Sequence, residues 1–303
     1  MTVSYCVTLY NKERHIAGVL AAAIAERSET GGEILVYDDA STDGSAAIAE
    51  RIAGRAPVRL LRGRRNAGVF AATNALLGLA SQPYLRIIDG DDEVVPGSTR
   101  HLLDILERLD AVLVHGAGAV RGAAAAGPRF PAARSAVETN PLRDCLRTFG
   151  YNLSVTLMPG AAVKAILPLP AEFRLAQDLC IALRLAKLGR FAVSEAVVAW
   201  SPSETANRLS RRMAAMYRDT CLVLAAELAE GASRADAAFA VRRNALRCRN
   251  YFRREAPGCL RPTDRAFLAR SAAAVAVESV DRHCERLRRM AALYARDEDR
   301  VLA

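Results

Sequence analysis

Aromatic rings are scarce in this chain of 303 residues, where Phe, Trp and Tyr together make up 6%. Proteins that bind single-stranded nucleic acid stack its bases on such rings, so we expect no nucleic-acid partner. The seven cysteines are scattered, odd in number and without a CxxC pair. That pattern fits neither a zinc site nor a disulfide framework, and it indicates reduced thiols in a cytoplasmic protein.

Long apolar runs are missing as well. No uninterrupted stretch approaches the ~20 residues that a membrane-spanning helix needs. The first residues, MTVSYCVTLYNKE, place no basic region before an apolar stretch and so do not resemble a signal peptide. We therefore expect a cytoplasmic protein, either soluble or peripheral at the inner face of the membrane.

The positive charge is concentrated near the C-terminus. The net charge of the chain is +9, yet residues 205–303 alone hold 20 Arg against 12 Asp plus Glu, a net +8. This asymmetry predicts two domains with different roles, residues 1–205 and a basic helical extension, residues 206–303. For the extension, four interpretations stay open: contact with anionic lipid, packing on the first domain, pairing in a homo-oligomer, or ordinary solvated arginine faces.

Short apolar runs alternate with helical patterns over the first 115 residues. Strands are expected at 3–9, 33–37, 58–62, 84–88 and 111–115, with helices at 12–27, 45–53, 71–80 and 96–109 between them. Such alternation is typical of βαβ units. The predicted fold is therefore α/β, with a mainly parallel central sheet flanked by helices. Further strands are expected at 153–157 and 191–200, with a helix at 175–188 and an all-helical pattern beyond about 210.

Polar clusters follow the first, second and fourth predicted strands at the point where each strand ends. They are Tyr10–Glu13, Asp38–Asp43 and Asp89–Asp92. The carboxyl ends of parallel strands share one edge of a sheet, and ligands bind in the crevice beyond that edge. We therefore expect the three clusters to lie close together.

The fourth strand ends in the sequence DGDD, residues 89–92. Three carboxylates within four residues repel one another unless a cation or hydrogen bonds neutralise them. Carboxylate oxygens suit Mg²⁺ or Mn²⁺, and Mg²⁺ is commonly held by one or two carboxylates together with substrate phosphates. The segment predicts a divalent cation site, with an acidic turn before the next helix as the structural alternative.

Two further carboxylate positions have a structural and a functional interpretation. Asp38 and Asp39 suit hydrogen bonds from a base imide and a ribose hydroxyl, while the residues after them suit a turn and a helix N-cap. Asp178 by position alone suits the N-terminus of a helix, where a negative charge contributes ~0.3–1 kcal/mol. The chain has no GxGxxG fingerprint and no P-loop, which disfavours a dinucleotide oxidoreductase and a P-loop NTPase.

Over roughly residues 2–205 the chain resembles the family 2 glycosyltransferases, which have the GT-A fold. Five segments in order carry the resemblance: VTLYNKE (7–13), VYDDASTDGS (36–45), RNAGVFAATN (65–74), YLRIIDGDDEVVPGS (84–98) and AQDLCIALRLAKLG (176–189). No single segment is decisive, but their order and spacing together are specific.

The resemblance implies a role for each matched residue. Asp91 and Asp92 would bind Mn²⁺ or Mg²⁺, and Asp178 would be the general base, with Gln177 where the family usually has Glu. Asp38 would form a hydrogen bond with the base of the nucleotide. The nucleotide-binding set as a whole would be Thr8, Tyr10, Asn11, Glu13, Asp38, Asp39, Asn66, Gly68 and Asp89.

The chain also departs from the family pattern. Thr73 stands where a basic residue is often found, which leaves a diphosphate contact missing or supplied by Arg64, Arg65 or Arg86. The segment AWSPSETANRLS lacks a His that can join the metal site. The QxxRW signature of processive members is absent, which indicates transfer of one sugar at a time.

The expected function is that of an inverting, metal-dependent glycosyltransferase. It would move a single sugar from a nucleoside diphosphate donor, a UDP-sugar, to a hydroxyl of a glycan or lipid-linked acceptor in glycan, glycolipid or cell-envelope biosynthesis. A non-catalytic sugar-nucleotide-binding scaffold with the same fold is the alternative. Nucleotidyl transfer is disfavoured because residues 8–14 offer no glycine-rich, basic loop for a triphosphate.

Overall fold

The computed structural model describes residues 1–121, 130, 134–138, 140–148, 152–203 and 213–302. By the density of contacts the chain divides into two compact units. An α/β unit comprises Met1–Pro141 and Tyr151–Thr205, and a helical unit comprises Leu142–Gly150 and Ala206–Ala303. The boundary that we predicted between residues 205 and 206 lies outside the described residues.

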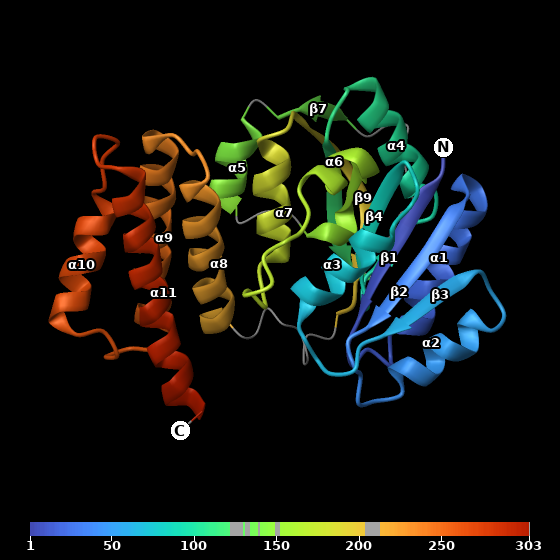
Figure 1. Cartoon of the computed structure of the whole chain (residues 1–303), viewed down its shortest axis with the longest axis horizontal. Coiled ribbons are helices and arrows are strands. Elements are labelled where there is room, and N and C mark those ends of the chain that lie inside the picture. The colour runs from blue at the N-terminus through green and yellow to red at the C-terminus, as the bar shows by residue number, and fades with distance from the viewer. Residues whose placement is uncertain (122–129, 131–133, 139, 149–151, 204–212, 303) are drawn as a thin grey trace. The chain divides into compact units, whose positions relative to one another are not determined.

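The α/β unit is built on one mixed sheet (Figure 1). Its described strands are β1 (Val3–Leu9), β2 (Gly32–Asp38), β3 (Val58–Arg62), β4 (Tyr84–Asp89), β5 (Glu93–Val94), β6 (Leu113–Val120), β7 (Ser135–Val137), β8 (Thr156–Pro159) and β9 (Phe191–Ser201). Their order is β3-β2-β1-β4-β8-β6-β9-β5, with β7 also paired to β9. The predicted central sheet flanked by helices is confirmed.

The sheet is parallel only in part. Strands β3, β2, β1 and β4 pair in parallel, as the βαβ pattern predicts, and β6 pairs in parallel with β9. Strand β8 is antiparallel to both β4 and β6, while β5 and β7 are antiparallel to β9. The antiparallel partners are strands of two to four residues, too short to leave a clear periodic pattern in the sequence.

Helices of the α/β unit connect the strands. They are α1 (Ile16–Thr30), α2 (Ser45–Ala53), α3 (Val69–Leu79), α4 (Ser98–Arg108), α6 (Gly160–Ala165) and α7 (Gln177–Ala186). Residues 153–155, expected as the start of a strand, form the 3-10 turn η2 (Leu153–Val155) because the Asn152 side chain accepts a hydrogen bond from the Ser154 amide. The strand begins directly after this turn, at Thr156.

The order of the strands creates a switch point beside β1. From β1 the chain proceeds to β2 and β3 on one side, and then returns to place β4 on the other side. A crevice opens at the carboxyl ends of the strands where such a reversal occurs, and ligands bind there in open α/β sheets. The clusters that follow β1 and β4 flank this switch point.

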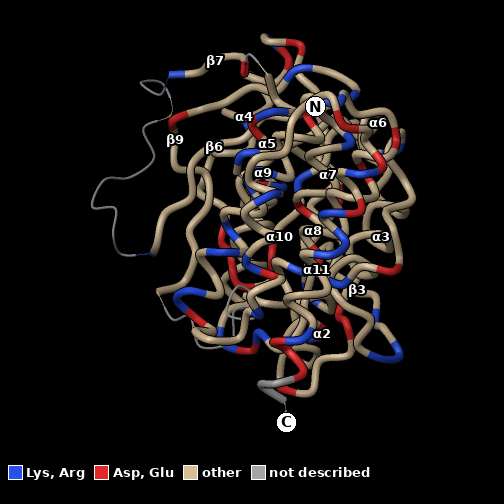
Figure 2. Tube along the Cα trace, turned by 90° about the vertical axis from the view of Figure 1, so that its left-hand side faces the viewer, with Lys and Arg blue, Asp and Glu red and all other residues tan. Residues whose placement is uncertain are grey.

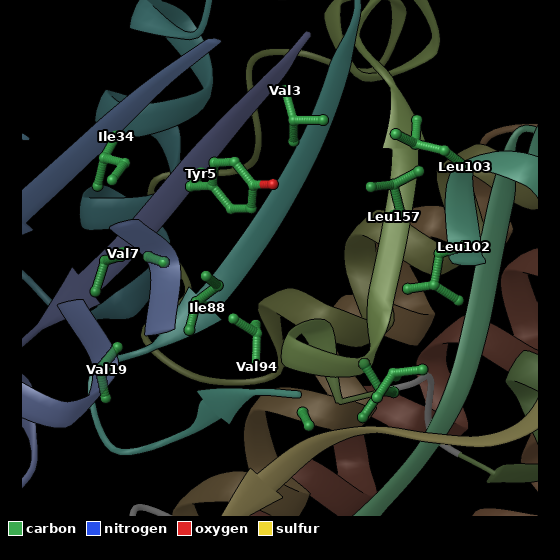
Figure 3. Close-up of a cluster of buried hydrophobic side chains, with 14 of the residues drawn as sticks. Val3, Tyr5, Val7, Val19, Ile34, Ile88, Val94, Leu102, Leu103 and Leu157 are labelled. Carbon is green, nitrogen blue, oxygen red and sulfur yellow. The ribbon is translucent and has the colours of Figure 1, made fainter. Parts of the chain in front are cut away.

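The core lies between the sheet and its helices. Alternate residues of β1, Val3, Tyr5 and Val7, point to one face and are fully buried, as Figure 3 shows. They join Val19 of α1 and Leu102 of α4 in one cluster. Burial of β1 on both faces and the helical stripe in α1 are the patterns expected of a strand that is covered on both sides. This packing fixes where β1 ends and therefore where its polar cluster begins.

The helical unit confirms that the C-terminal region is helical. Its long helices are α8 (Met213–Ala229), α9 (Arg234–Arg254), α10 (Pro262–Ala272) and α11 (Val280–Leu302), with α5 (Pro141–Thr148) beginning at the boundary. Tyr217, Tyr251, Phe252 and Tyr294 form an aromatic cluster among α8, α9 and α11. No helix in the described part of the chain is long and apolar enough to cross a membrane.

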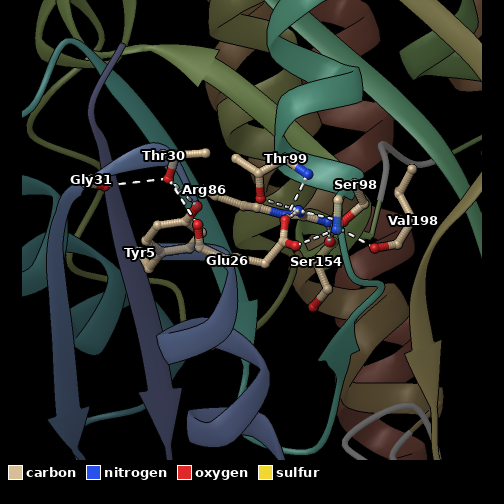
Figure 4. Close-up of polar contacts among 10 residues, drawn as sticks. Tyr5, Glu26, Thr30, Gly31, Arg86, Ser98, Thr99, Ser154 and Val198 are labelled. Atoms are coloured by element: carbon tan, nitrogen blue, oxygen red, sulfur yellow. Dashed lines mark hydrogen bonds and ion pairs between the residues drawn. The ribbon is translucent and has the colours of Figure 1, made fainter. Parts of the chain in front are cut away.

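Arg86 of β4 is the largest fully buried side chain of the α/β unit. Its guanidinium donates to the hydroxyls of Ser98 and Thr99 at 2.8 and 2.7 Å and to the Val198 carbonyl at 2.8 Å (Figure 4). Burial lowers the pKa of Arg86 to about 10, while Glu26 favours its charged form. Arg86 is thus occupied inside the fold, and the interpretation of this residue as a diphosphate contact is wrong.

Glu26 of α1 is the buried counter-charge. One of its oxygens lies 3.7 Å from Arg86, and its carboxylate accepts from the backbone amides of Gly97 and Thr99 at 2.5 and 2.8 Å. The pair therefore ties α1, β4 and the start of α4 together. A buried ion pair is costly to break, because the remaining charge has no water to solvate it.

Replacing Glu26 by Gln should destabilise the protein by about 3 kcal/mol, since the buried Arg86 keeps its positive charge but loses the negative charge that balances it. Urea denaturation followed by circular dichroism measures the change. The matched control is Glu50→Gln, which breaks the exposed Arg62–Glu50 pair and should cost less than about 1 kcal/mol. Equal costs for the two variants would show that the buried pair does not hold these elements together.

Candidate active site

The ends of β1 and β4 meet at the predicted position. The Thr8 hydroxyl donates to Asp89 Oδ1 at 3.3 Å, and the Asp89 amide donates to the Ser154 hydroxyl at 3.0 Å. Thr8 and Asp89 are direct partners in the register of the two strands. The neighbouring Gly90 has no room for a side chain, because a Cβ there would lie 2.7 Å from the Thr8 carbonyl oxygen. Close packing at the switch point therefore sets the direction in which Asp91 and Asp92 leave β4.

Asp91 already holds a cation, the side chain of Lys12. The Lys12 ammonium lies 2.6 Å from Asp91 Oδ2, and both side chains are mostly buried. Lys12 was not among the predicted site residues, although Tyr10, Asn11 and Glu13 of the same segment were. The positive charge of Lys12 was the signal in the sequence that could have identified it, since a lysine can act as the counter-ion of an acidic cluster. The site thus contains a position that favours positive charge.

Asp92 is more deeply engaged in the fold. Its Oδ1 accepts from the Ser201 hydroxyl at 2.7 Å, and its Oδ2 accepts from the Asn152 side chain at 3.2 Å. The side chain is buried. These bonds link the end of β4 to β9 and to η2. A carboxylate oxygen has more than one lone pair, so both oxygens keep acceptor capacity beyond these contacts.

Asp89 titrates far from its ordinary range. Burial, together with the negative charges of Asp92, Asp91 and Asp178, raises the pKa of Asp89 to about 7, although the charge of Lys12 acts to lower it. Asp178 is distant in sequence, yet its charge acts on Asp89. The first turn of α7 and the end of β4 are therefore brought to one site. Carboxylates whose pKa values are strongly shifted are typical of functional sites.

Asp178 is the second residue of α7, and the N-cap residue Ala176 has a left-handed backbone with φ 66°. Burial raises the pKa of Asp178 to about 6, although its Oδ1 accepts from the Leu179 amide at 2.8 Å. A carboxylate with this pKa is ionised at neutral pH and is a stronger base than an exposed aspartate. The side chain combines the helix N-terminal position with the properties of a proton acceptor.

Asp38 and Asp39 follow β2 and behave differently from each other. Asp38 is fully buried, and its Oδ2 has no hydrogen-bond partner among the described residues, with Arg62 Nε 3.6 Å away. Asp39 is satisfied, because its two oxygens accept from the amides of Ala67 and Gly68 at 2.9 and 2.8 Å. Asp38 thus has acceptor capacity for a ligand, whereas Asp39 orders the loop before α3.

The loop after β1 is fastened to the loop after β2. Asn11 has φ 51°. Its side-chain Oδ1 accepts a hydrogen bond from the Thr42 backbone amide at 2.8 Å, and its backbone amide donates to the Ser41 hydroxyl. Glu13 accepts from the Gly44 amide at 2.9 Å. Tyr10 stands out of this network with an exposed fraction of 41%. Asn11 and Glu13 therefore shape the rim, and Tyr10 offers a free ring at its edge.

Asn66 and Gly68 lie in the loop that Asp39 orders. Asn66 accepts from the Arg174 guanidinium at 2.9 Å, and Gly68 begins α3 with φ 91°, a conformation that suits glycine. Arg174 is a second residue that sequence reasoning missed, since nothing in its local pattern indicates contact with a loop more than one hundred residues away. Thr73 is buried in α3 with its hydroxyl unpaired among described residues, so it offers no contact at this surface.

The carboxylates at the end of β4 are ligands of the type that a divalent cation takes. Within the described ranges no group of three or more His, Cys, Asp or Glu side chains is placed to hold a metal ion. Mg²⁺ needs fewer protein ligands, because it is commonly held by one or two carboxylates and the phosphates of its substrate. The contact of the Lys12 ammonium with Asp91 shows that this position attracts positive charge.

A family model and several known proteins match parts of the chain. Residues 4–140 match the family model described as glycosyl transferase family 2. The chain is 34% identical over 109 residues to the succinoglycan biosynthesis protein ExoO of Rhizobium meliloti, covering 36% of this chain and 30% of that protein. It is 31% identical over 118 residues to the putative glycosyltransferase EpsE of Bacillus subtilis, covering 38% and 42%. The matches thus span less than half of these relatives.

Solved structures resemble nearly the whole chain. The S. aureus TarS 1–349 complex with UDP-GlcNAc has a TM-score of 0.69 at 16% identity, covering 98% of this chain and 92% of that one. The Pyrobaculum calidifontis mannosyltransferase PcManGT, in complex with GDP-Man and Mn²⁺, has a TM-score of 0.59 at 17% identity, covering 97% and 85%. The α/β unit has the GT-A fold, and residues 4–140 of the chain match the model of glycosyl transferase family 2.

Proposed function

We propose that this protein is an inverting, metal-dependent glycosyltransferase that moves one sugar from a nucleoside diphosphate donor to an acceptor hydroxyl. The proposal rests on the closeness of two carboxylates that are far apart in the sequence, since the charge of Asp178 raises the pKa of Asp89 at the acidic end of β4. The reaction needs two separate functions. The acidic end of β4 would neutralise the leaving diphosphate through a cation, and Asp178 would remove a proton from the nucleophile.

The nucleotide would lie along the crevice beside β1. Asp38 is suited to the nucleotide base, since its buried Oδ2 has no hydrogen bond among the described residues and its ion-pair neighbour Arg62 lies 3.6 Å away. Thr8, Asn11 and Glu13 would shape this pocket, with Tyr10 at its edge. Asp39, Asn66 and Gly68 would serve it indirectly, by fixing the loop before α3.

Asp91 would hold Mn²⁺ or Mg²⁺, with Asp92 and Asp89 close by. A bound cation supplies Lewis-acid stabilisation of the negative charge that develops on the leaving diphosphate. In this arrangement Lys12 would leave Asp91 and become available for a phosphate oxygen, which compensates for the absence of a basic side chain at Thr73. Asp92, held by Ser201 and Asn152, would keep the end of β4 rigid.

Asp178 would act as the general base from the opposite side of the sugar. An acceptor hydroxyl is a weak nucleophile, and a carboxylate within ~2.6–3.2 Å can remove its proton as it attacks the anomeric carbon. A single displacement from the face opposite the leaving group inverts that carbon. The raised pKa of Asp178 makes the transfer of the proton more favourable than it would be to an ordinary aspartate.

The relatives support a role in polysaccharide biosynthesis. ExoO is named for succinoglycan biosynthesis, and TarS has been solved with UDP-GlcNAc. We propose a UDP-sugar donor and a glycan or lipid-linked acceptor, with single-sugar transfer because the QxxRW signature is absent. A cytoplasmic location, with or without peripheral membrane contact, is part of the same proposal.

The alternative function is a sugar-nucleotide-binding scaffold without catalysis. The observation that favours it is the Lys12–Asp91 pair, which places the protein's own cation where a metal would bind. Both functions predict stabilisation by a nucleotide sugar in a thermal-shift screen of UDP-, GDP- and dTDP-sugars with Mn²⁺. Only the enzyme slowly hydrolyses the stabilising donor, with water in place of the acceptor.

Asp178→Asn should lower donor hydrolysis by about 10²–10⁴-fold, the usual contribution of a general base. Affinity for the donor with Mn²⁺ should stay within about twofold, because Asn keeps the size of the side chain. Nucleotide release and calorimetry measure the two quantities. The matched control is Asp110→Asn in the exposed turn after α4, for which both quantities should be unchanged. Undiminished hydrolysis by the Asp178 variant would remove this residue from the mechanism.

Asp91→Asn should weaken Mn²⁺-dependent binding of UDP at least about tenfold. Even the hydrogen-bond partners of metal ligands are worth about 10–100-fold in metal affinity, and a direct ligand should contribute no less. Calorimetry with Mn²⁺ and with EDTA measures the effect. The metal-free affinity of the variant serves as the internal control and should match that of the unaltered protein. A loss of the same size in EDTA would mean that Asp91 does not act through a metal.

Hydrolysis at saturating donor and Mn²⁺ should fall as the pH is lowered through about 6. A base works in its ionised form, and burial raises the pKa of Asp178 to about 6, so protonation at acidic pH removes the active form. The rate measured from pH 5 to 8 should follow a single ionisation. The residual rate of Asp178→Asn should lack this acidic limb. An acidic limb that persists in the variant would assign the ionisation to another group.

A further inference from the structure

A cavity of about 340 Å³ lies in the helical unit, in the corner between the end of α9 and the start of α10. Its apolar wall includes Phe252, Leu260 and Leu268. Phe252 and Leu268 have exposed fractions of 4% and 2%, so this wall belongs to the core of the unit. Gly258, with φ 83°, makes the turn that separates the two helices. The volume is within the range of small-ligand pockets, about 300–1,000 Å³.

Three arginines line the same cavity: Arg249, Arg253 and Arg265. All three are exposed. Arg249 and Arg253 are four residues apart and therefore lie on one face of α9, and Arg265 comes from the first turns of α10. No acidic side chain lines the cavity. The cavity thus combines an apolar wall with an exposed edge of three positive charges, and Figure 2 shows such basic positions along α9 and α10.

These arginines differ from others of the helical unit. Arg286 is paired with Glu278 at 2.5 and 2.8 Å, and Arg296 is paired with Asp264 at 2.8 Å. For Arg249, Arg253 and Arg265 the described residues provide no ion pair and no side-chain hydrogen bond. Three like charges around one cavity attract an anion, and no acidic side chain among the described lining residues competes with it. The charge at this cavity points to an anionic ligand.

The shape of the lining indicates what kind of anion. The guanidinium fork matches phosphate oxygens with two parallel hydrogen bonds, but a free phosphate would leave the partly exposed Leu260 in contact with water. A nucleic acid would need an open ring for stacking, and the Phe252 ring is already packed against Tyr251 and Tyr294. An amphiphile with a phosphate headgroup satisfies both the arginines and the wall.

We propose that the cavity between α9 and α10 binds the phosphate headgroup of an anionic phospholipid, with Arg249, Arg253 and Arg265 holding the phosphate and Phe252, Leu260 and Leu268 contacting the start of an acyl chain. The site would attach the protein to an anionic membrane surface. Anionic leaflets attract clustered basic side chains, and a built pocket adds a specific site to this general attraction. The proposal stands independently of glycosyl transfer.

The test uses the full chain and dihexanoyl phosphatidylglycerol, a short-chain anionic phospholipid, below its micelle concentration. The variant replaces Arg249, Arg253 and Arg265 together by Gln. The matched control replaces Arg234, Arg270 and Arg288 by Gln, which removes the same charge from exposed positions of the helical unit outside the cavity. Calorimetry measures the affinity, and circular dichroism checks that both variants fold.

We expect the cavity variant to bind the lipid at least tenfold more weakly than the unaltered chain, and the control variant to bind within about twofold. Sedimentation with vesicles of phosphatidylcholine containing phosphatidylglycerol should show the same order, with no binding to phosphatidylcholine alone. Leu260→Gln should weaken lipid binding while leaving any binding of inorganic phosphate unchanged.

Four results would overturn the proposal. Equal losses in the two arginine variants would show that only the overall charge matters. Inorganic phosphate bound as tightly as the lipid would make the cavity a site for a free anion. A decaglutamate peptide that binds more tightly than the lipid, and that loses affinity in the cavity variant, would make it a site for an acidic protein. Absence of lipid binding by the unaltered chain would leave the cavity without this function.

Discussion

Repulsion among carboxylates at the end of β4 is the constraint around which the candidate site is arranged. Asp89, Asp91 and Asp92 leave the same strand, and the pKa of Asp89 rises to about 7 because burial and neighbouring charges oppose its ionisation. The fold accepts this arrangement by surrounding it with donors, from Lys12 on Asp91 to Ser201 and Asn152 on Asp92. A site that gathers negative charge in this way is prepared for a cation.

The strand that carries these carboxylates is held by a buried charge pair. Arg86 lies three residues before Asp89, and its contacts with Glu26, Ser98 and Thr99 tie β4 to α1 and α4. Because the pair lies inside the core, it does not contribute to the chemistry directly. Its effect is to fix the direction in which β4 ends. The same residue type therefore has opposite functions in the two units, with Arg86 satisfied internally and the arginines of the α9–α10 cavity available to a ligand.

The basic extension is more specific than its composition suggests. Many of its arginines have carboxylate partners within the helical unit, as in the Arg218–Glu298 and Arg286–Glu278 pairs. Net charge alone therefore overstates how much positive charge is available for binding. The available charge is concentrated where an apolar wall lies beside it, and that coincidence separates a binding site from an ordinary solvated face.

The sequence by itself determined the alternation of strands and helices in the first part of the chain, the convergence of polar clusters at strand ends, and the helical C-terminal region. It did so because strands that are buried on both faces form short apolar runs, and buried helices repeat their apolar residues every 3.6 residues, so both are recognisable from local sequence. Only the tertiary structure decided the antiparallel strands β5, β7 and β8, the burial of Arg86, the Lys12–Asp91 pair and the approach of Asp178 to Asp89. Each of these depends on contacts between segments far apart in the chain, and neither short strands nor single charged residues carry a periodic pattern that identifies their partners.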